Sequence, residues 1–262
     1  MKITLAYIYP ESGSNGHFVE AFRFIHTYHQ FPPGAAHDTL IISNGGPCDP
    51  EAAALFATLP GCRMVEHDDT GWDIGGYLAA ARTVEADLMV CCGGNLYFHR
   101  AGWLARLAEA RKKHGPGLYG TSASYERSPH LNTTGFACPP GELACYPYPV
   151  VTKQDRYVFE HGRANASLDL TEPDRNMNRA FWRVVYRKGM PVKLVTWDGE
   201  WDWWQWRRPP NIYRRGDQSN MLVWWKLSDA YGESTGHDQR IFSASTDTLA
   251  DPDFNLAKRT FK

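Results

Sequence analysis

The clearest candidate for acid–base chemistry is a carboxylate beside a histidine. Glu160 follows the apolar and aromatic run Tyr157-Val158-Phe159 and precedes His161. Burial among such side chains could raise the pKa of Glu160 toward neutrality, where a carboxylate can accept the proton of a hydroxyl group. We therefore predict Glu160 and His161 as the catalytic residues.

Both residues also have a structural interpretation. Glu160 could simply pair with Arg156 or Arg163, and a lone histidine such as His161 is often a hydrogen-bonded core residue. Asp169 is the second candidate for the base. The two interpretations differ in where the carboxylate must lie, because a catalytic base must face a bound substrate.

A pair of arginines near the C-terminal end suits an anionic ligand. Arg214 and Arg215 precede Asp217 and Gln218, where the pattern predicts the start of a helix. The first turn of a helix offers free N–H groups and the positive end of the helix dipole, and both attract phosphate. We predict that these four residues bind phosphate groups of a ligand. The alternative is a surface loop in which Asp217 caps the helix.

Hydroxyl and indole groups are the candidates for contacts to a second substrate. Thr133 and Thr134 lie in a polar loop, and the ten residues Trp197–Trp206 include five tryptophans. Indoles stack on the apolar faces of sugar rings, so we predict Trp201 and Trp203, with the two threonines, as acceptor-binding residues. A polar surface turn and a tryptophan-rich core are the alternatives. The acids between the tryptophans argue against nucleic-acid binding.

The elements that must position these residues alternate between strand and helix over residues 1–120. Apolar runs predict strands at Lys2–Ile8, Thr39–Ser43, Arg63–Glu66, Leu88–Cys92 and Leu118-Tyr119. Helical spacing predicts helices at Phe18–Tyr28, Glu51–Leu59, Gly75–Val84 and Gly102–Lys113. This alternation predicts an α/β fold with parallel strands and with helices on both faces of the sheet.

Ligands of such sheets bind beyond the carboxyl ends of the strands. Here those ends are polar or glycine-rich, which predicts a site for a nucleotide-linked ligand. The residues that we expect to contact it there are Tyr9, Asn44, Asp73, Gly94 and Asn95.

The second half of the chain is less regular. The pattern predicts helices at Asn178–Lys188 and Gln218–Asp229 and strands at Pro191–Thr196 and Ile241–Ala244. Neither a repeat nor a linker is visible. We therefore expect one domain over residues 1–262, with a nucleotide-binding half (1–120) and an irregular acceptor-binding and catalytic half (121–262).

The composition is that of an ordinary globular protein. The 262 residues are 43% hydrophobic and 22% charged, and the formal net charge of −1 favours neither nucleic acid nor an anionic membrane. The first apolar run ends at Pro10, too soon for a secretory signal, and none is long enough to span a membrane. The six cysteines lack zinc-site spacing, so we expect reduced thiols and a cytoplasmic location.

Three motifs carry a resemblance to a known family. The strand end Ile41–Gly46, the turn Asp69–Tyr77 and the strand Asp87–Asn95, followed by Trp103, resemble the inverting, family-2-like GT-A glycosyltransferases. The family's asparagine in the turn is Asp69 here. The resemblance implies a Rossmann-like GT-A fold, a nucleotide-sugar donor, inverting transfer and a catalytic base at the position of Glu160.

One motif of the family is degenerate. Its metal-binding DXD position falls on Gly93-Gly94-Asn95, and glycines supply no ligand for a hard cation. The resemblance implies Mn²⁺ or Mg²⁺ as the cofactor, with Asn95 and His237 as candidate ligands. The alternative is a metal-independent enzyme in which cationic side chains and backbone N–H groups stabilise the diphosphate.

The expected function is transfer of a sugar from a nucleotide-sugar donor to a hydroxyl acceptor. That acceptor is open: a glycan, a lipid carrier, a protein or a modified nucleic acid. A non-catalytic nucleotide-sugar or carbohydrate binder on the same scaffold is the main alternative, because the carboxylates at residues 93–95 are missing. Dinucleotide, P-loop and hydrolase motifs are absent from the sequence.

Overall fold

A computed structural model describes residues 1–10, 15–124, 129–162, 177–206 and 218–225. Its strands are β1 (Ile3–Pro10), β2 (Asp38–Asn44), β3 (Arg63–His67), β4 (Leu88–Cys92), β5 (Leu96–Tyr97), β6 (Leu118–Gly120), β7 (Ala123–Ser124), β8 (His130–Leu131), β9 (Gly135–Cys138), β10 (Val192–Val195), β11 (Glu200–Asp202) and β12 (Trp224–Trp225). Its helices are α1 (Asn15–Gln30), α2 (Pro50–Phe56), α3 (Trp72–Ala81), α4 (Trp103–His114), α5 (Pro140–Ala144), α6 (Lys153–His161) and α7 (Phe181–Arg187).

The central feature is an 8-stranded mixed sheet with the order β11-β10-β6-β9-β4-β1-β2-β3. β1 is parallel to β2 and β4, and β2 is parallel to β3, as the alternating pattern predicts. β6 and β10 are also parallel to each other, whereas β9 and β11 run antiparallel to their neighbours. The predicted α/β class with a mainly parallel sheet is confirmed.

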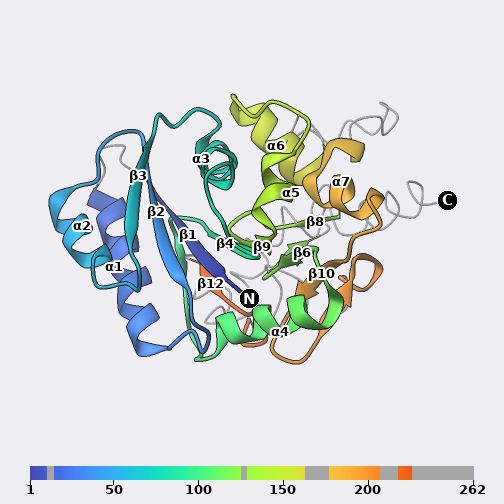
Figure 1. Ribbon diagram of the computed structural model, residues 1–262, viewed down its shortest axis with the longest axis horizontal. Helices are drawn as coiled ribbons and strands as arrows, with labels where there is room; N and C mark the ends of the chain where they lie inside the picture. The colour runs from blue at the N-terminus through green and yellow to red at the C-terminus, as the bar shows by residue number, and fades with distance from the viewer. Residues whose placement is uncertain (11–14, 125–128, 163–176, 207–217, 226–262) are drawn as a thin grey trace, which may run out of the picture.

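Helices cover both faces of this sheet (Figure 1). Along β1, Leu5 and Tyr7 face one apolar core, which is built with α1, α2 and α4, while Ala6 and Ile8 face the other core, with α3, α5, α6 and α7. Alternate residues of a strand point to opposite faces, so one apolar run can supply both cores. The site described below lies on the side of α3 and α6.

The antiparallel strand β9 corrects the predicted topology. Leu118–Gly120 forms a strand as predicted, but it does not pair with β4, because Gly135–Cys138 lies between them and hydrogen-bonds to both. Since β9 runs opposite to β4, its first residue, Gly135, lies opposite Cys92 at the carboxyl end of β4. The loop before β9 therefore lies at the edge where ligands are expected.

Three elements of the second half differ from the predictions. Residues 218–225 are not helical, and Trp224–Trp225 instead pairs with Leu96–Tyr97 as a short antiparallel strand. The predicted Asn178–Lys188 helix is divided at Ala180 into a short 3₁₀ turn and α7. Residues 226–229 and the predicted Ile241–Ala244 strand lie outside the described residues.

The helix Lys153–His161 has recognisable boundary residues, although its periodicity does not predict it. Thr152 and Asp155 form a reciprocal capping box at its start, and Gly162 ends it with a positive φ of 77°. Val158 and Phe159 are buried, and Phe159 belongs to the apolar core on this face of the sheet. The capping pattern is the sequence feature that could have placed Glu160 in a helix rather than in a loop.

Membrane-spanning helices do not occur in the described part of the chain, because none combines sufficient length with sufficient apolar character. All six cysteines are free thiols, and Cys91, Cys92 and Cys138 are buried in the sheet.

Candidate functional site

The turn after β3 carries the first group of predicted ligand contacts. Asp69, Gly71 and Trp72 all have positive φ values, of 65°, 75° and 60°. A Cβ atom on Gly71 would lie only 2.2 Å from the carbonyl oxygen of Val150, so a glycine is required there. Left-handed conformations at non-glycine residues cost free energy and persist only where the surroundings hold them.

Asn44 is the residue that holds this turn. Its Nδ2 donates a hydrogen bond to Asp69 Oδ1, and its Oδ1 lies 2.6 Å from His67 Nδ1. Burial raises the pKa of Asp69. Asn44 is itself buried, so the structure places it as the support of the turn at the carboxyl ends of β2 and β3.

Arg156 is the centre of the site. Its Nε lies 2.7 Å from Asp73 Oδ1, and its Nη2 donates to Asp73 Oδ2 at 3.1 Å and to Thr133 Oγ1 at 3.1 Å. Its Nη1 donates to Glu160 Oε2 at 3.3 Å. Burial lowers the pKa of Arg156, but the charges of Asp73 and Glu160 outweigh burial and raise it above its ordinary value. One cation therefore joins residues from α3, α6 and the loop before β9.

Glu160 occupies the last turn of α6 and is buried. Its Oε1 accepts a hydrogen bond from the backbone N–H of Thr133 at 3.3 Å, and Oε2 lies 3.5 Å from His161 Nε2. The ring centroid of His161 lies 4.1 Å from that of His130. The pairing of Glu160 with Arg156, which was the structural alternative, is present within α6. The hydrogen bond from Thr133, in the loop before β9, holds Glu160 beside the carboxyl edge of the sheet.

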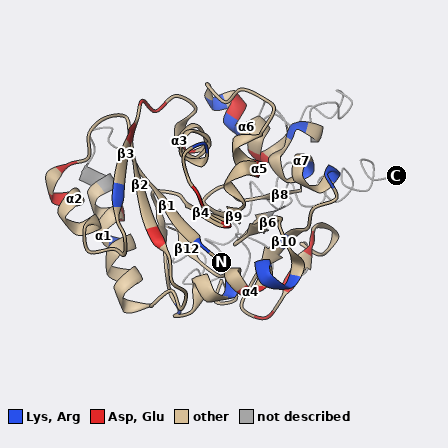
Figure 2. Ribbon diagram, in the orientation of Figure 1, with Lys and Arg blue, Asp and Glu red and all other residues tan. Residues whose placement is uncertain are grey.

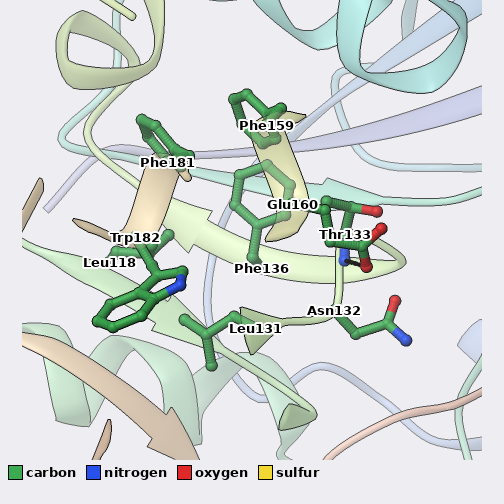
Figure 3. Close-up of a pocket in the computed structure, with 9 residues that line it drawn as sticks. All are labelled: Leu118, Leu131, Asn132, Thr133, Phe136, Phe159, Glu160, Phe181 and Trp182. Carbon is green, nitrogen blue, oxygen red and sulfur yellow. Dashed lines mark hydrogen bonds between the residues drawn. The ribbon is translucent and has the colours of Figure 1, made fainter. Parts of the chain in front are cut away.

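A small cavity adjoins Glu160 (Figure 3). Its walls are mainly apolar, with polar groups only on the side of the loop before β9, and the lining residues are Leu118, Leu131, Asn132, Thr133, Phe136, Phe159, Glu160, Phe181 and Trp182. The carboxylate therefore lies at a boundary between an apolar wall and a polar loop.

A second cavity shares Asn132 with the first as a lining residue. Thr134 and Gln218 both line it, so the structure brings together one predicted acceptor contact and one predicted phosphate contact. The backbone carbonyl of Gln218 accepts a hydrogen bond from Trp224 Nε1 at 2.9 Å, and the Gln218 side chain is buried. Asn132 lines both cavities and accepts a hydrogen bond from Thr134 N.

The residues at the end of β4 do not fit a divalent metal ion. Gly93 and Gly94 offer no side-chain ligand, and a Cβ atom on Gly94 would lie 2.9 Å from Pro10 Cδ and 3.0 Å from the carbonyl oxygen of Ile8. The carbonyl of Gly94 already accepts a hydrogen bond from Tyr7 Oη at 2.8 Å. Packing against β1 therefore excludes a carboxylate at the centre of this motif unless the backbone moves. Asn95 is half-buried beside it.

Tyr9 and the predicted acceptor contacts Trp201 and Trp203 lie apart from Arg156 and the residues that it contacts. The ring of Tyr9 packs edge-on against Phe56 of α2, in the core on the opposite face of the sheet from Phe159. Trp201 Nε1 donates to Thr196 Oγ1 at 2.8 Å, which holds the indole at the outer edge of the sheet.

Trp203 packs against Trp182 and Tyr186 of α7. Neither Trp201 nor Trp203 lines the two cavities formed by the described residues. The other predicted contacts near the C-terminal end, Arg214, Arg215 and Asp217, lie outside the described residues, as does the candidate metal ligand His237.

Arg156 and His130 are the site residues whose roles the sequence does not reveal. The spacing of Arg156 and Glu160 is that of an i,i+4 helix pair, which the capping pattern of α6 could have exposed. The pairing of Arg156 with Asp73 and that of His130 with His161 leave no local trace in the sequence, because they join segments that are distant along the chain.

No protein-family model matches the sequence, and no curated protein matches it. Among solved structures, the chain is similar to a mannosyltransferase from Pyrobaculum calidifontis in complex with GDP-Man and Mn²⁺, with 13% identity, a TM-score of 0.43 and coverage of 56% of this chain and 47% of that one. It is also similar to S. aureus TarS in complex with UDP, with 9% identity, a TM-score of 0.45 and coverage of 60% and 53%.

A third similar structure is a Bacillus anthracis protein assigned as a glucose-1-phosphate thymidylyltransferase and crystallised with sucrose. It has 11% identity, a TM-score of 0.47 and coverage of 76% of this chain and 88% of that one. The chain spans about half the length of the mannosyltransferase and of the TarS fragment.

Proposed function

We propose that this chain is a glycosyltransferase that moves a sugar from a nucleotide-sugar donor to a hydroxyl acceptor with inversion. The observation that carries the proposal is the connection made by Arg156. Asp73 belongs to the turn Asp69–Tyr77, which resembles a motif of the family, and Glu160 is the residue at which the resemblance implies the base. Arg156 links the two carboxylates at the carboxyl edge of the sheet, where α/β proteins bind their ligands.

This arrangement suggests a separate role for each of these residues in the proposed reaction. Asn44 supports the turn that carries Asp73, so the nucleotide lies along the ends of β2 and β3. Arg156 and the backbone N–H of Thr133 orient Glu160, which accepts the proton of the acceptor hydroxyl as that oxygen attacks the anomeric carbon. Thr133 and Thr134 present hydroxyl groups beside the acceptor.

We propose that the reaction needs no metal ion at the end of β4. A carboxylate cannot replace Gly94 without clashes with β1, and Arg156 is already paired with two carboxylates. The charge of the leaving diphosphate must then be balanced elsewhere, and Arg214 and Arg215 remain the proposed partners. Substitution of both arginines by glutamine is expected to weaken donor binding roughly tenfold or more, because charge-assisted hydrogen bonds are lost.

A donor screen on the full chain tests the proposal. A ligand that binds only the native state raises its stability, and at one hundred times its Kd the midpoint of thermal unfolding should rise by roughly 5 °C. Nucleoside diphosphates and their sugars are compared with and without Mn²⁺, and donor hydrolysis is followed as release of nucleoside diphosphate. Absence of both stabilisation and release for every donor would contradict the proposal.

The same screen separates the main alternative, a non-catalytic binder on this scaffold. The observation that favours the binder is the close packing of Gly94, which removes the usual metal ligands. Stabilisation by a nucleotide sugar, with no release of nucleoside diphosphate in the presence of glycan, lipid, protein or nucleic-acid acceptors, would support the binder. Any enzyme-dependent release would support the transferase.

A further inference from the structure

Two histidines and a carboxylate meet where α6 ends beside β8. Each of His130, Glu160 and His161 offers one ligand atom, and these atoms all lie within 4.8 Å of one another. His130 and Glu160 are buried, and the side chain of His161 is 11% exposed. This is the one group of three such residues in the described part of the chain.

We propose that His130, Glu160 and His161 bind a divalent transition-metal ion of the Zn²⁺ type. Imidazole nitrogen suits Zn²⁺, Co²⁺, Ni²⁺ and Cu²⁺, whereas Mg²⁺ and Ca²⁺ prefer oxygen ligands. Three protein ligands with a fourth position for water are typical of an open zinc site. The site is distinct from the glycine-rich end of β4 and uses none of its residues.

The distances are close to those of a metal site. With bonds of 2.0–2.1 Å, neighbouring ligands of a tetrahedral ion lie about 3.3 Å apart. His161 Nε2 and Glu160 Oε2 are 3.5 Å apart, and all three ligand atoms lie within 4.8 Å of one another. Side-chain rotations that shorten the longest of these separations by about 1.5 Å would bring the three ligand atoms onto one ion.

The surroundings favour a cation despite Arg156. His161 is the last residue of α6, and the carboxyl end of a helix dipole attracts positive charge. Arg156 contacts Glu160 at 3.3 Å, but its charge is also balanced by Asp73. A carboxylate has about four lone-pair positions, so Glu160 can accept from Arg156 and bind an ion at once.

The consequence for Glu160 separates this inference from the proposed transfer reaction. A metal-bound carboxylate is a poor proton acceptor, so Zn²⁺ at this site is expected to inhibit transfer rather than support it. Metal binding can be measured without any substrate, so the inference does not depend on the donor or on the acceptor.

Calorimetry on the untagged, chelator-treated full chain tests the site directly. Zn²⁺ is titrated into the unaltered chain and into the His161→Gln, His130→Gln and Glu160→Gln variants, and Mg²⁺ serves as the oxygen-preferring comparison. Loss of outer-shell partners alone weakens metal sites 10- to 100-fold, so removal of a ligand should weaken Zn²⁺ binding by at least about tenfold. The matched control is His29→Gln, at an exposed histidine that contacts Thr58 on the far side of the sheet; it should bind Zn²⁺ as the unaltered chain does.

Circular dichroism of the metal-free variants shows which of them remain folded. X-ray absorption at the zinc edge of the unaltered chain examines the ligands without any substitution, and it should show two imidazoles and oxygen ligands. One imidazole or none in the zinc spectrum, or Zn²⁺ affinity that folded His161→Gln retains in full, would overturn the proposal. Zn²⁺ binding at this site together with an inactive donor screen would leave the metal site standing and reject the transferase.

Discussion

Arg156 and Asp73 lie 83 positions apart, and yet one guanidinium binds both carboxylate oxygens of Asp73, with Nε 2.7 Å from Oδ1 and Nη2 3.1 Å from Oδ2. The pair joins the first turn of α3 to α6, and Figure 2 shows that both signs of charge occur on α6. It therefore connects the donor half of the proposed site to the catalytic half.

The Arg156→Met substitution is expected to destabilise the protein by about 2–3 kcal/mol. It leaves Asp73 and Glu160 without their shared cation, and this cost lies below the 3–5 kcal/mol of a fully buried pair because the ion pair keeps some solvent contact. Urea unfolding measures the change. Arg187→Met on the exposed side of α7 is the control, and equal effects of the two substitutions would refute the structural role of Arg156.

Glu160→Gln is expected to lower the transfer rate at least about 100-fold, because general bases contribute factors of 10² to 10⁴. The amide oxygen can still accept from the Thr133 N–H, so the variant should remain folded. Glu142→Gln removes a carboxylate that pairs with Lys188 on the surface and should keep full activity. Steady-state rates of both variants with the active donor and acceptor measure this difference. Unchanged turnover in Glu160→Gln would exclude Glu160 as the base.

Gly94→Ala and Gly141→Ala should have opposite effects on stability. The new Cβ at position 94 would meet Pro10 and the carbonyl of Ile8, which is expected to cost about 1–3 kcal/mol, as in other overpacked sites. At position 141 no atom lies within 4 Å of the new Cβ, and loss of backbone freedom in the unfolded chain should stabilise by about 0.4–1 kcal/mol. Thermal unfolding of both variants measures the contrast, and a neutral Gly94→Ala would contradict the packing at the end of β4.

The contribution of Glu200 to the free energy of unfolding depends on pH. Burial alone would raise the pKa of Glu200, but hydrogen bonds from Lys113 and Arg106 lower it from 4.5 to about 2. A carboxyl group whose pKa is lower in the folded than in the unfolded state stabilises the protein at pH values above the unfolded-state pKa. This stabilisation is lost as the pH falls from about 5 toward 2. Glu200→Gln should therefore cost about 2 kcal/mol at pH 7 and almost nothing near pH 2.

Denaturant unfolding across this pH range measures the contribution of Glu200. The control is Glu142→Gln, which removes one partly exposed ion pair and should cost less than about 1 kcal/mol at neutral pH. A Glu200→Gln effect that is the same at pH 7 and pH 2 would contradict the ion-pair cluster between β11 and α4.

The reactivity of the cysteine thiols tests the packing of the sheet core. Cys145 is exposed, whereas Cys91, Cys92 and Cys138 are buried, and burial raises their pKa values. A thiol reagent needs the thiolate, so Cys145 should react in the native protein and the three buried thiols only after unfolding. Peptide mass spectrometry after brief labelling checks this. Fast labelling of Cys138 would mean that β9 is not inserted between β4 and β6.

The sequence alone determined the first part of the sheet. Continuous apolar runs such as Leu88–Cys92 bury both faces of a strand, and polar or glycine-rich residues follow each run, so the parallel strands and the ligand edge could be predicted from local patterns. The proposed catalytic residues Glu160 and His161 could likewise be suggested by a local pattern, because they are neighbours in the chain. Helix limits such as Trp72–Ala81 moved by a few residues, because a strained turn sets where the helix begins.

Only the tertiary structure decided how the halves combine. Insertion of Gly135–Cys138 beside β4 depends on hydrogen bonds to two strands that are distant in sequence, and four residues carry too little periodicity to predict it. Trp224–Trp225 is a strand because its backbone pairs with that of Leu96–Tyr97, which is distant in the sequence. The contact of Arg156 with Asp73 has the same cause: local residue patterns fix which faces are buried, whereas long-range packing fixes which charged groups meet.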